Sequence, residues 1–119
     1  MNNRSFGTLG EERAKEYLEH KGYRILDCNY RVGRLGEIDI VARDNDTLCF
    51  IEVKTRSNNR FGTPAQAVMP QKQATIIKIA QIYMQKYKYY DIPVRFDIVE
   101  IFMDREGNTR DVNLLKNAF

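Results

Sequence analysis

The sequence predicts an α/β domain in which a mixed sheet is packed between helices. A stretch with helical spacing over residues 7–21 precedes three stretches with strand-like alternation within residues 23–56. A second helical stretch over residues 70–89 then leads to a fourth strand over residues 94–102. A helix that connects two strands of one sheet forms a crossover, which makes these strands parallel and the sheet mixed. A chain of 119 residues is long enough for one core and too short for two, so we expect a single domain over residues 1–119.

The first helix is predicted from apolar residues that recur at helical spacing. These residues are Phe6, Leu9, Ala14, Tyr17 and Leu18, and Gly22 suits the end of the helix. Glu11 lies three residues before Ala14, on the flank of the apolar stripe, whereas Glu12 lies further round toward solvent. Glu11 can therefore reach the sheet, or it can stabilise the helix dipole as an exposed first-turn acid.

The next three elements are predicted to form a meander of strands. Residues 23–31, 36–40 and 50–54 are rich in β-branched and aromatic residues that alternate with polar ones. A turn at Asn45 and Asp46 lies between the last two of these segments. If these are the two central residues of a tight hairpin, residues that face each other across it have numbers that add up to 91.

This hairpin register brings charged residues together. Asp39 faces Glu52, and Glu37 faces Lys54. Side chains alternate along a strand, so these four project from one face together with Val41 and Phe50. The opposite face receives Ile38, Ile40, Cys49, Ile51 and Val53. Because both faces carry apolar residues, we expect both to be covered and the acids to be half-buried.

Two opposed carboxylates suggest a cation site. Their Cβ atoms lie about 5 Å apart, so the charges repel unless a cation lies between them. Mg²⁺ prefers oxygen ligands from one or two carboxylates and keeps several waters. Asp39 and Glu52 supply such oxygens, and the ammonium of Lys54 can stabilise charge that develops on a phosphate. A charge-paired sheet edge explains the same residues, so both interpretations stay open.

The second half of the chain supplies a loop, a helix and the end of the sheet. Residues 56–64 form a polar loop beside the acids. Pro70 suits the first turn of the second helix, and Lys72 in that turn is poorly placed for the helix dipole. On the strand over residues 94–102 we interpret Asp97 as structural. A turn and a short strand or turn over residues 109–115 close the sheet.

Overall composition constrains function only weakly. The 19 Lys and Arg residues against 16 Asp and Glu give a net charge of +3, which is only mildly basic. Basic residues surround the acidic pair in sequence: Arg31, Arg34, Lys54, Arg56 and Arg60. They suit a phosphate backbone, and they suit a solvated loop nearly as well. Two cysteines, Cys28 and Cys49, lie in predicted strands and are expected to be buried free thiols. No apolar run is long enough to span a membrane and the amino terminus lacks a signal-peptide core, so we expect a cytoplasmic protein without membrane contact.

Several motifs together resemble a known group of proteins. Asp39, a turn and then Glu52-Val53-Lys54 resemble the core of the PD-(D/E)xK nuclease superfamily. The chain resembles more specifically the YraN family of small bacterial proteins, which is similar to archaeal Holliday-junction resolvases. The motifs that carry this resemblance are Gly7-x-x-Gly10-Glu11-x-x-Ala14-x-x-Tyr17-Leu18, Asn29-Tyr30-Arg31, Gly36-Glu37-Ile38-Asp39, Phe50 to Arg56, Phe61-Gly62-Thr63-Pro64, Arg95-Phe96-Asp97 and Asn117-Ala118-Phe119.

The resemblance implies a restriction-endonuclease-like α/β/α core and roles for single residues. Asp39 and Glu52 match the metal-binding acids, the carbonyl of Val53 is implied as a further ligand, and Lys54 matches the catalytic lysine. Glu11 matches an acid that approaches the metal. Lys72 matches a family lysine that can contact phosphate, although a solvated surface lysine suits it equally. The proline that commonly precedes the superfamily aspartate is replaced by Ile38.

Three functions follow from these observations. The first is a Mg²⁺-dependent DNA endonuclease, with Mn²⁺ as a substitute, that acts on branched or repair intermediates. Resolvase-like relatives act as homodimers, so the resemblance also implies a homodimer. The alternative is a nucleic-acid-binding accessory module that keeps the fold without cleaving. The third is a structural scaffold, for which two opposed carboxylates would have no use.

Overall fold

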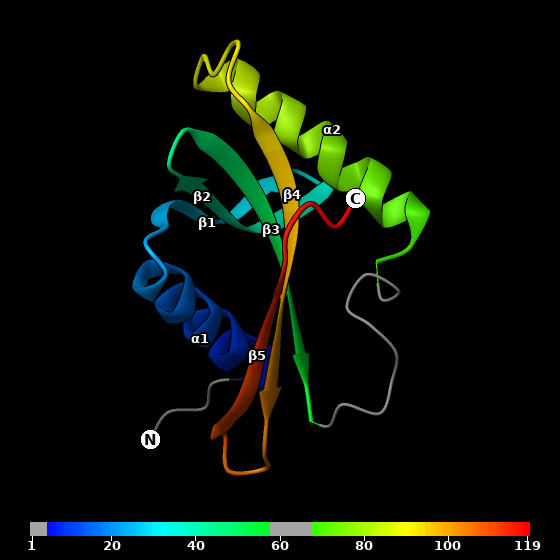
Figure 1. Cartoon of the computed structure of the whole chain (residues 1–119). Helices are drawn as coiled ribbons and strands as arrows, with labels where there is room; N and C mark the ends of the chain where they lie inside the picture. Colours follow the sequence, from blue (N-terminus) through cyan, green and yellow to red (C-terminus); the bar gives the residue numbers. More distant parts are fainter. Residues whose placement is uncertain (1–4, 58–67) are drawn as a thin grey trace.

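The computed structural model describes residues 5–57 and 68–119 and shows a mixed sheet between two helices. The elements follow one another as α1 (Phe6–His20), β1 (Arg24–Val32), β2 (Gly36–Asp44), β3 (Thr47–Arg56), α2 (Pro70–Lys86), β4 (Val94–Met103) and β5 (Thr109–Leu115). The five strands are ordered β1-β2-β3-β4-β5, as Figure 1 shows. β3 and β4 are parallel and the other pairs are antiparallel. The predicted α/β fold class and element order are confirmed.

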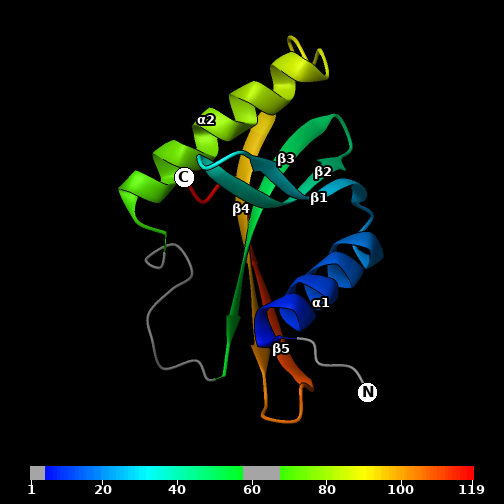
Figure 2. The same ribbon diagram turned by 180° about the vertical axis from the view of Figure 1, so that it is seen from behind.

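Each helix covers one face of the sheet (Figures 1 and 2). The face under α1 buries Ala14, Leu18, Tyr23, Ile40, Ala42, Cys49, Ile51, Val99, Ile101 and Met103. The face under α2 buries Ile38, Val41, Leu48, Phe50, Val68, Ile76, Ile79, Ala80, Tyr83 and Ile98. Val41 and Phe50 are paired and lie under α2, whereas their neighbours in sequence Ile40 and Ile51 lie under α1. β2 and β3 are therefore covered on both faces, as predicted, and polar side chains at their ends are partly withdrawn from water.

Local sequence explains most helix ends. Ser5 caps α1, and its hydroxyl accepts a hydrogen bond of 3.0 Å from the backbone N–H of Thr8. Pro70 is the first residue of α2, where its missing N–H costs nothing. α2 ends at Lys86, three residues before the predicted end, because Lys88 adopts a left-handed conformation with φ of 59°.

The first helix lies very close to the sheet at Gly10. A Cβ atom at this position would lie 1.9 Å from the Oγ1 atom of Thr55 on β3. Only glycine therefore permits this approach. The contact holds the first half of α1 against β3 and sets the position of the next residue, Glu11.

A partly buried ion-pair network joins β4 to the ends of other elements. Arg95 donates to Asp97 at 2.9 Å, to Asp44 at 2.9 Å and to the hydroxyl of Tyr23 at 2.8 Å. Asp97 is fully buried and also accepts the backbone N–H of Asn117 at 2.8 Å. Since a buried charge is costly unless it is paired and hydrogen-bonded, this network confirms the structural role predicted for Asp97.

The prediction of two buried thiols is confirmed for only one cysteine. Cys49 is a buried free thiol as predicted, but Cys28 is exposed, because β1 is an edge strand and Cys28 lines a shallow hollow beside α1. Within residues 5–57 and 68–119, no helix has the length and apolar character needed to cross a membrane.

Candidate metal site

β2 and β3 pair in the predicted register and then separate at the acidic residues. Val41 pairs with Phe50 and Ile40 with Ile51, and the ladder ends there. Beyond it, the Oδ2 atom of Asp39 accepts the backbone N–H of Val53 at 2.8 Å. A carboxylate thus takes the place of a strand carbonyl, and the strands part where the acids lie.

The separation at Asp39 corrects the predicted alternation in one place. Ile38 was expected to share a face with Ile40, but Ile38 packs under α2 and Ile40 under α1. The ladder between β1 and β2 passes over Asp39 and its neighbour Asn29, which has a left-handed φ of 52°. Irregularities of this kind re-aim side chains, and they are frequent beside functional sites.

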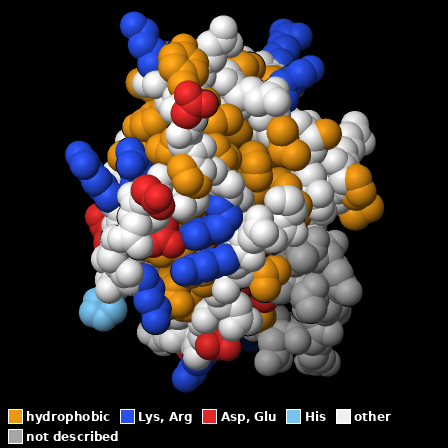
Figure 3. All heavy atoms as spheres, turned by 45° about the horizontal axis from the view of Figure 1, so that its top comes forward, with side chains coloured by type: hydrophobic (Ala, Val, Ile, Leu, Met, Phe, Trp, Pro, Cys, Tyr) orange, Lys and Arg blue, Asp and Glu red, His pale blue; other side chains and the backbone are white. Residues whose placement is uncertain are grey.

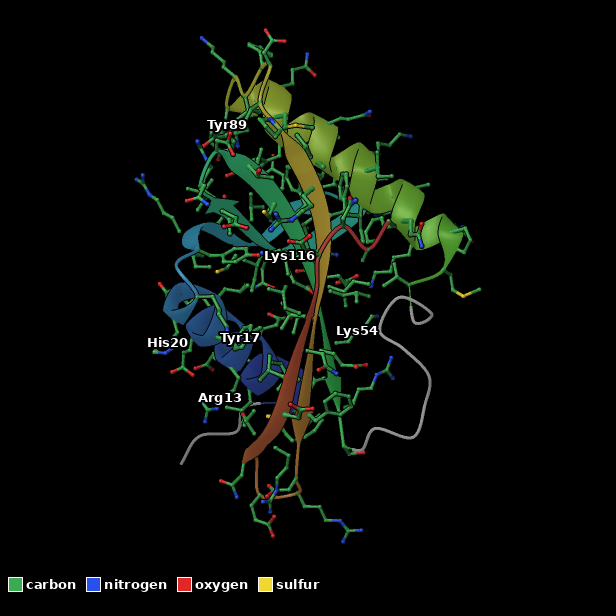
Figure 4. The ribbon with its side chains drawn as sticks, viewed as in Figure 1. Arg13, Tyr17, His20, Lys54, Tyr89 and Lys116 are labelled. Atoms are coloured by element: carbon green, nitrogen blue, oxygen red, sulfur yellow. The ribbon has the colours of Figure 1, made fainter. Side chains whose placement is uncertain are left out.

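The expected partnership of Glu37 with Lys54 is wrong. Pairing of β2 and β3 stops before these residues, so they do not face each other in the ladder. Glu37 forms an ion pair of 3.4 Å with Arg31 on β1. Lys54 is aligned instead with Glu100 of the neighbouring strand β4, and its side chain extends away from α1 in Figure 4.

Asp39 and Glu52 come together as predicted, and their carboxyl groups lie within hydrogen-bonding reach of each other. Burial raises the pKa of Asp39 to about 9, and the hydrogen bond and negative charge of Glu52 act in the same direction. Burial also acts to raise the pKa of Glu52, but the Asp39 carboxyl and the Lys72 ammonium outweigh it and lower that pKa. The two carboxyl groups therefore titrate as one unit that keeps a shared proton at neutral pH, and burial favours the protonated form of Asp39.

Lys72 provides the positive charge nearest to this pair. Its Nζ atom lies 2.8 Å from Oε2 of Glu52, although Lys72 belongs to the first turn of α2 and its side chain is 48% exposed. The Glu52 side chain is only 5% exposed, and its Oε2 atom has no partner with hydrogen-bond geometry. The contact is thus an ion pair at the edge of a buried carboxylate.

Glu11 approaches the same site from α1. It is partly buried, and burial raises the pKa of its carboxyl group; the charges of Glu37 and Glu52 raise it further, while a hydrogen bond with Asn29 lowers it. Glu11 therefore reaches the sheet rather than standing free as a first-turn acid. Asn29 itself adopts a left-handed conformation with φ of 52°, which the alternation of strand residues does not predict.

The oxygen atoms present suit a hard divalent cation. Among the residues that the structure describes, no three His, Cys, Asp or Glu side chains converge on one metal position. Two carboxylates with retained waters are nevertheless a common donor set for Mg²⁺. The Oε2 atom of Glu52 is buried and has no partner with hydrogen-bond geometry, and a bound cation would compensate it. The residues therefore fit a Mg²⁺ ion held mainly by Asp39 and Glu52.

Hollows lie on both sides of the pair. One of about 120 Å³ is lined by Glu11, Asn29 and Asp39, with Cys28 at its edge. Another of about 430 Å³ lies between the β1–β2 turn and α2 and is lined by Glu37 and Lys72, among other residues. Asp39 therefore borders the hollow beside α1, whereas the hollow beside α2 is bordered by Lys72, which contacts Glu52.

The predicted phosphate contacts differ in their surroundings. Arg34 is exposed, and Arg31 is exposed although paired with Glu37. Arg56 is less available for contact with phosphate because it pairs with Glu100, whose side chain is 2% exposed. The charge of Arg56 thus compensates a buried acid. Arg60 lies outside the described residues.

Basic side chains are not gathered on the face shown in Figure 3, where Lys and Arg are dispersed among apolar and acidic groups. Arg31, Arg34, Lys54 and Lys72 are the predicted phosphate contacts whose side chains are not paired with a buried acid of β4.

Fold and site together define a small α/β domain with a mixed sheet and a carboxylate pair where two central strands part. The sequence model described as "Uncharacterised protein family UPF0102" matches residues 10–101, and the chain belongs to this family. This YraN-like family is the one that the motifs predict.

Relatives of the same description match over nearly their whole length. A UPF0102 protein of Acetivibrio thermocellus is 45% identical over 99% of this chain and 93% of its own. The UPF0102 protein of Alkaliphilus oremlandii is 48% identical, over 98% and 99% of the two chains. That of Dictyoglomus thermophilum is 46% identical over the whole of both chains.

Proposed function

We propose that the protein is a Mg²⁺-dependent DNA endonuclease that hydrolyses phosphodiester bonds, with Mn²⁺ as a substitute. One observation carries this proposal: Asp39 and Glu52, on the two consecutive strands of one hairpin, meet where the ladder between these strands is broken and strand pairing does not account for two acids. A structural ion pair would not place two carboxylates against each other. The superfamily resemblance of Glu52-Val53-Lys54 supports the same reaction.

Each residue would contribute separately. Asp39 and Glu52 would hold the ion, and the Val53 carbonyl would be a further ligand. Glu11 on α1 would assist them as an acid that approaches the ion. The ion supplies Lewis-acid activation of water and of the phosphate. The Val53 N–H fixes the orientation of the Asp39 carboxylate. Lys54, two residues beyond Glu52 on the same strand, would stabilise negative charge developing on the phosphate or orient the attacking water.

DNA is the proposed substrate, in branched or repair intermediates, and the cytoplasm is the proposed location. The exposed Arg31 and Arg34 would contact the phosphate backbone near the acids. A homodimer would present two such sites to a junction, and this part of the proposal depends on the resolvase resemblance alone.

The test is a cleavage assay on single-stranded, duplex, flap and four-way DNA with Mg²⁺ or Mn²⁺. We expect cleavage of at least one substrate, with loss on Asp39→Asn and on Glu52→Gln. Glu106→Gln, which changes an exposed acid in the β4–β5 turn, is the matched control and should retain activity. No cleavage of any substrate by the folded wild-type protein would overturn the endonuclease proposal.

A second candidate is a nucleic-acid-binding accessory module. It is favoured because, among the described residues, no set of three His, Cys, Asp or Glu side chains is placed to hold a metal ion together. In that case the protein should bind DNA in gel-shift assays with the same affinity in wild type and in Asp39→Asn.

A further inference from the structure

The contact between Lys72 and Glu52 has an unusual setting. The Glu52 carboxylate is almost completely buried, and Lys72 reaches it from the surface at 2.8 Å. Oε2 of Glu52 has no partner with hydrogen-bond geometry. The ammonium therefore serves as a counter-ion for an oxygen that otherwise lacks a partner.

The position of Lys72 in α2 is unfavourable for the stability of that helix. Lys72 is in the first turn of α2, which contains no acidic residue, and a cation there is repelled by the positive end of the helix dipole. Glu52 on β3 supplies the compensating negative charge. Lys72 is thus held toward the acidic pair by an interaction between elements.

We propose that Lys72 is an internal counter-ion that occupies the cation position of the site and must leave Glu52 when a divalent cation binds. This inference rests on the metal site of the proposed function. A divalent cation and an ammonium group cannot both lie at bonding distance from the same oxygen without strong repulsion. Metal affinity is consequently lower than the two carboxylates alone would give.

Displacement from Glu52 also makes the Lys72 ammonium available for contact with a phosphate. Its side chain is already 48% exposed and lines the 430 Å³ hollow beside the acids, so the freed ammonium can meet a phosphate there. Metal binding and phosphate binding at this site should therefore strengthen each other.

The test compares variants by calorimetric titration with Mn²⁺ at one fixed pH. Lys72→Met should bind Mn²⁺ roughly tenfold more tightly than wild type, because a charged contact to Glu52 no longer has to be broken. Lys72→Arg keeps the charge and should remain near wild type. Lys78→Met removes an exposed lysine from the same helix and should change the affinity less than about twofold, which controls for net charge.

A measurement on the wild-type protein covers the case in which Lys72→Met does not fold. The NMR resonances of the Lys72 side chain should move toward those of a solvated lysine on saturation with Mg²⁺. Equal or weaker Mn²⁺ affinity in folded Lys72→Met, or unchanged Lys72 resonances at saturation, would overturn the counter-ion role and leave the metal site in place. Absence of metal binding in wild type and all variants would overturn both.

Discussion

Binding of a divalent cation should expel a proton from the carboxylate pair. Burial and the neighbouring Glu52 raise the pKa of Asp39 to about 9, so the metal-free pair keeps one proton at neutral pH. A carboxyl group must lose its proton to serve as a metal ligand. At any pH below the pKa of Asp39, the affinity for the metal ion therefore rises as the pH rises.

The size of the effect follows from this pKa. Because pH 7 lies well below this pKa, the metal-free pair keeps its shared proton, so close to one proton should be released for each ion bound. The apparent affinity for Mg²⁺ should rise about tenfold per pH unit, or about a hundredfold from pH 6 to pH 8. The rise should level off above this pKa, where the pair is already ionised.

Calorimetry in two buffers of different ionisation enthalpy measures the released protons directly. Wild type should release about one proton per Mg²⁺ at pH 7, while Glu106→Gln should behave as wild type. Asp39→Asn should lose both the release and most of the affinity. Stoichiometric Mg²⁺ binding without proton release would show that Asp39 is ionised in the free protein and would refute this description of the pair.

Three further changes test the roles of single residues. Lys54→Ala should abolish cleavage but leave Mn²⁺ affinity within about threefold, because a group that acts on the transition state is not a ligand; a parallel loss of metal binding would contradict this. Gly10→Ala should lower the free energy of unfolding by about 1–3 kcal/mol in urea titrations, since the facing β3 side chain leaves no room for a Cβ. Gly7→Ala, which has open space around it, should instead be neutral or stabilising by up to about 1 kcal/mol, and equal effects would contradict the close approach. Arg95→Met should cost about 3–5 kcal/mol by the same measurement because it strands the buried charge of Asp97, whereas a loss below about 1 kcal/mol would argue against the network.

The hairpin was predictable because one local signal determines it. The turn at Asn45 and Asp46 gives the register, and the observed pairing of Val41 with Phe50 follows from it. The meeting of Asp39 and Glu52 could therefore be predicted without knowledge of distant elements. The sheet face on which Ile38 lies could not be predicted. Asp39 accepts a strand hydrogen bond in place of a carbonyl, and the alternation of apolar and polar residues does not reveal this.

Interactions between distant elements explain the remaining differences. Arg56 and Glu100 are 44 positions apart and pair because β3 and β4 lie side by side. The sequence gives no sign of this pairing, so Arg56 was predicted to contact phosphate. The 2.8 Å contact of Lys72 with Glu52 likewise requires the position of α2 over the sheet. The early end of α2 depends on the left-handed Lys88, and lysine is not a residue that signals this conformation.

The hydrogen bond from the Val53 N–H to Asp39 makes a single backbone amide a reporter of the site. Amide protons exchange with solvent deuterium only when their hydrogen bond opens, so the exchange rate at Val53 measures how often this carboxylate detaches. A ligand that binds Asp39 without breaking this hydrogen bond would slow exchange, and one that pulls the carboxylate from the strand would accelerate it. Occupancy of the site can in this way be followed in solution without a substrate, a cleavage product or a label on any side chain.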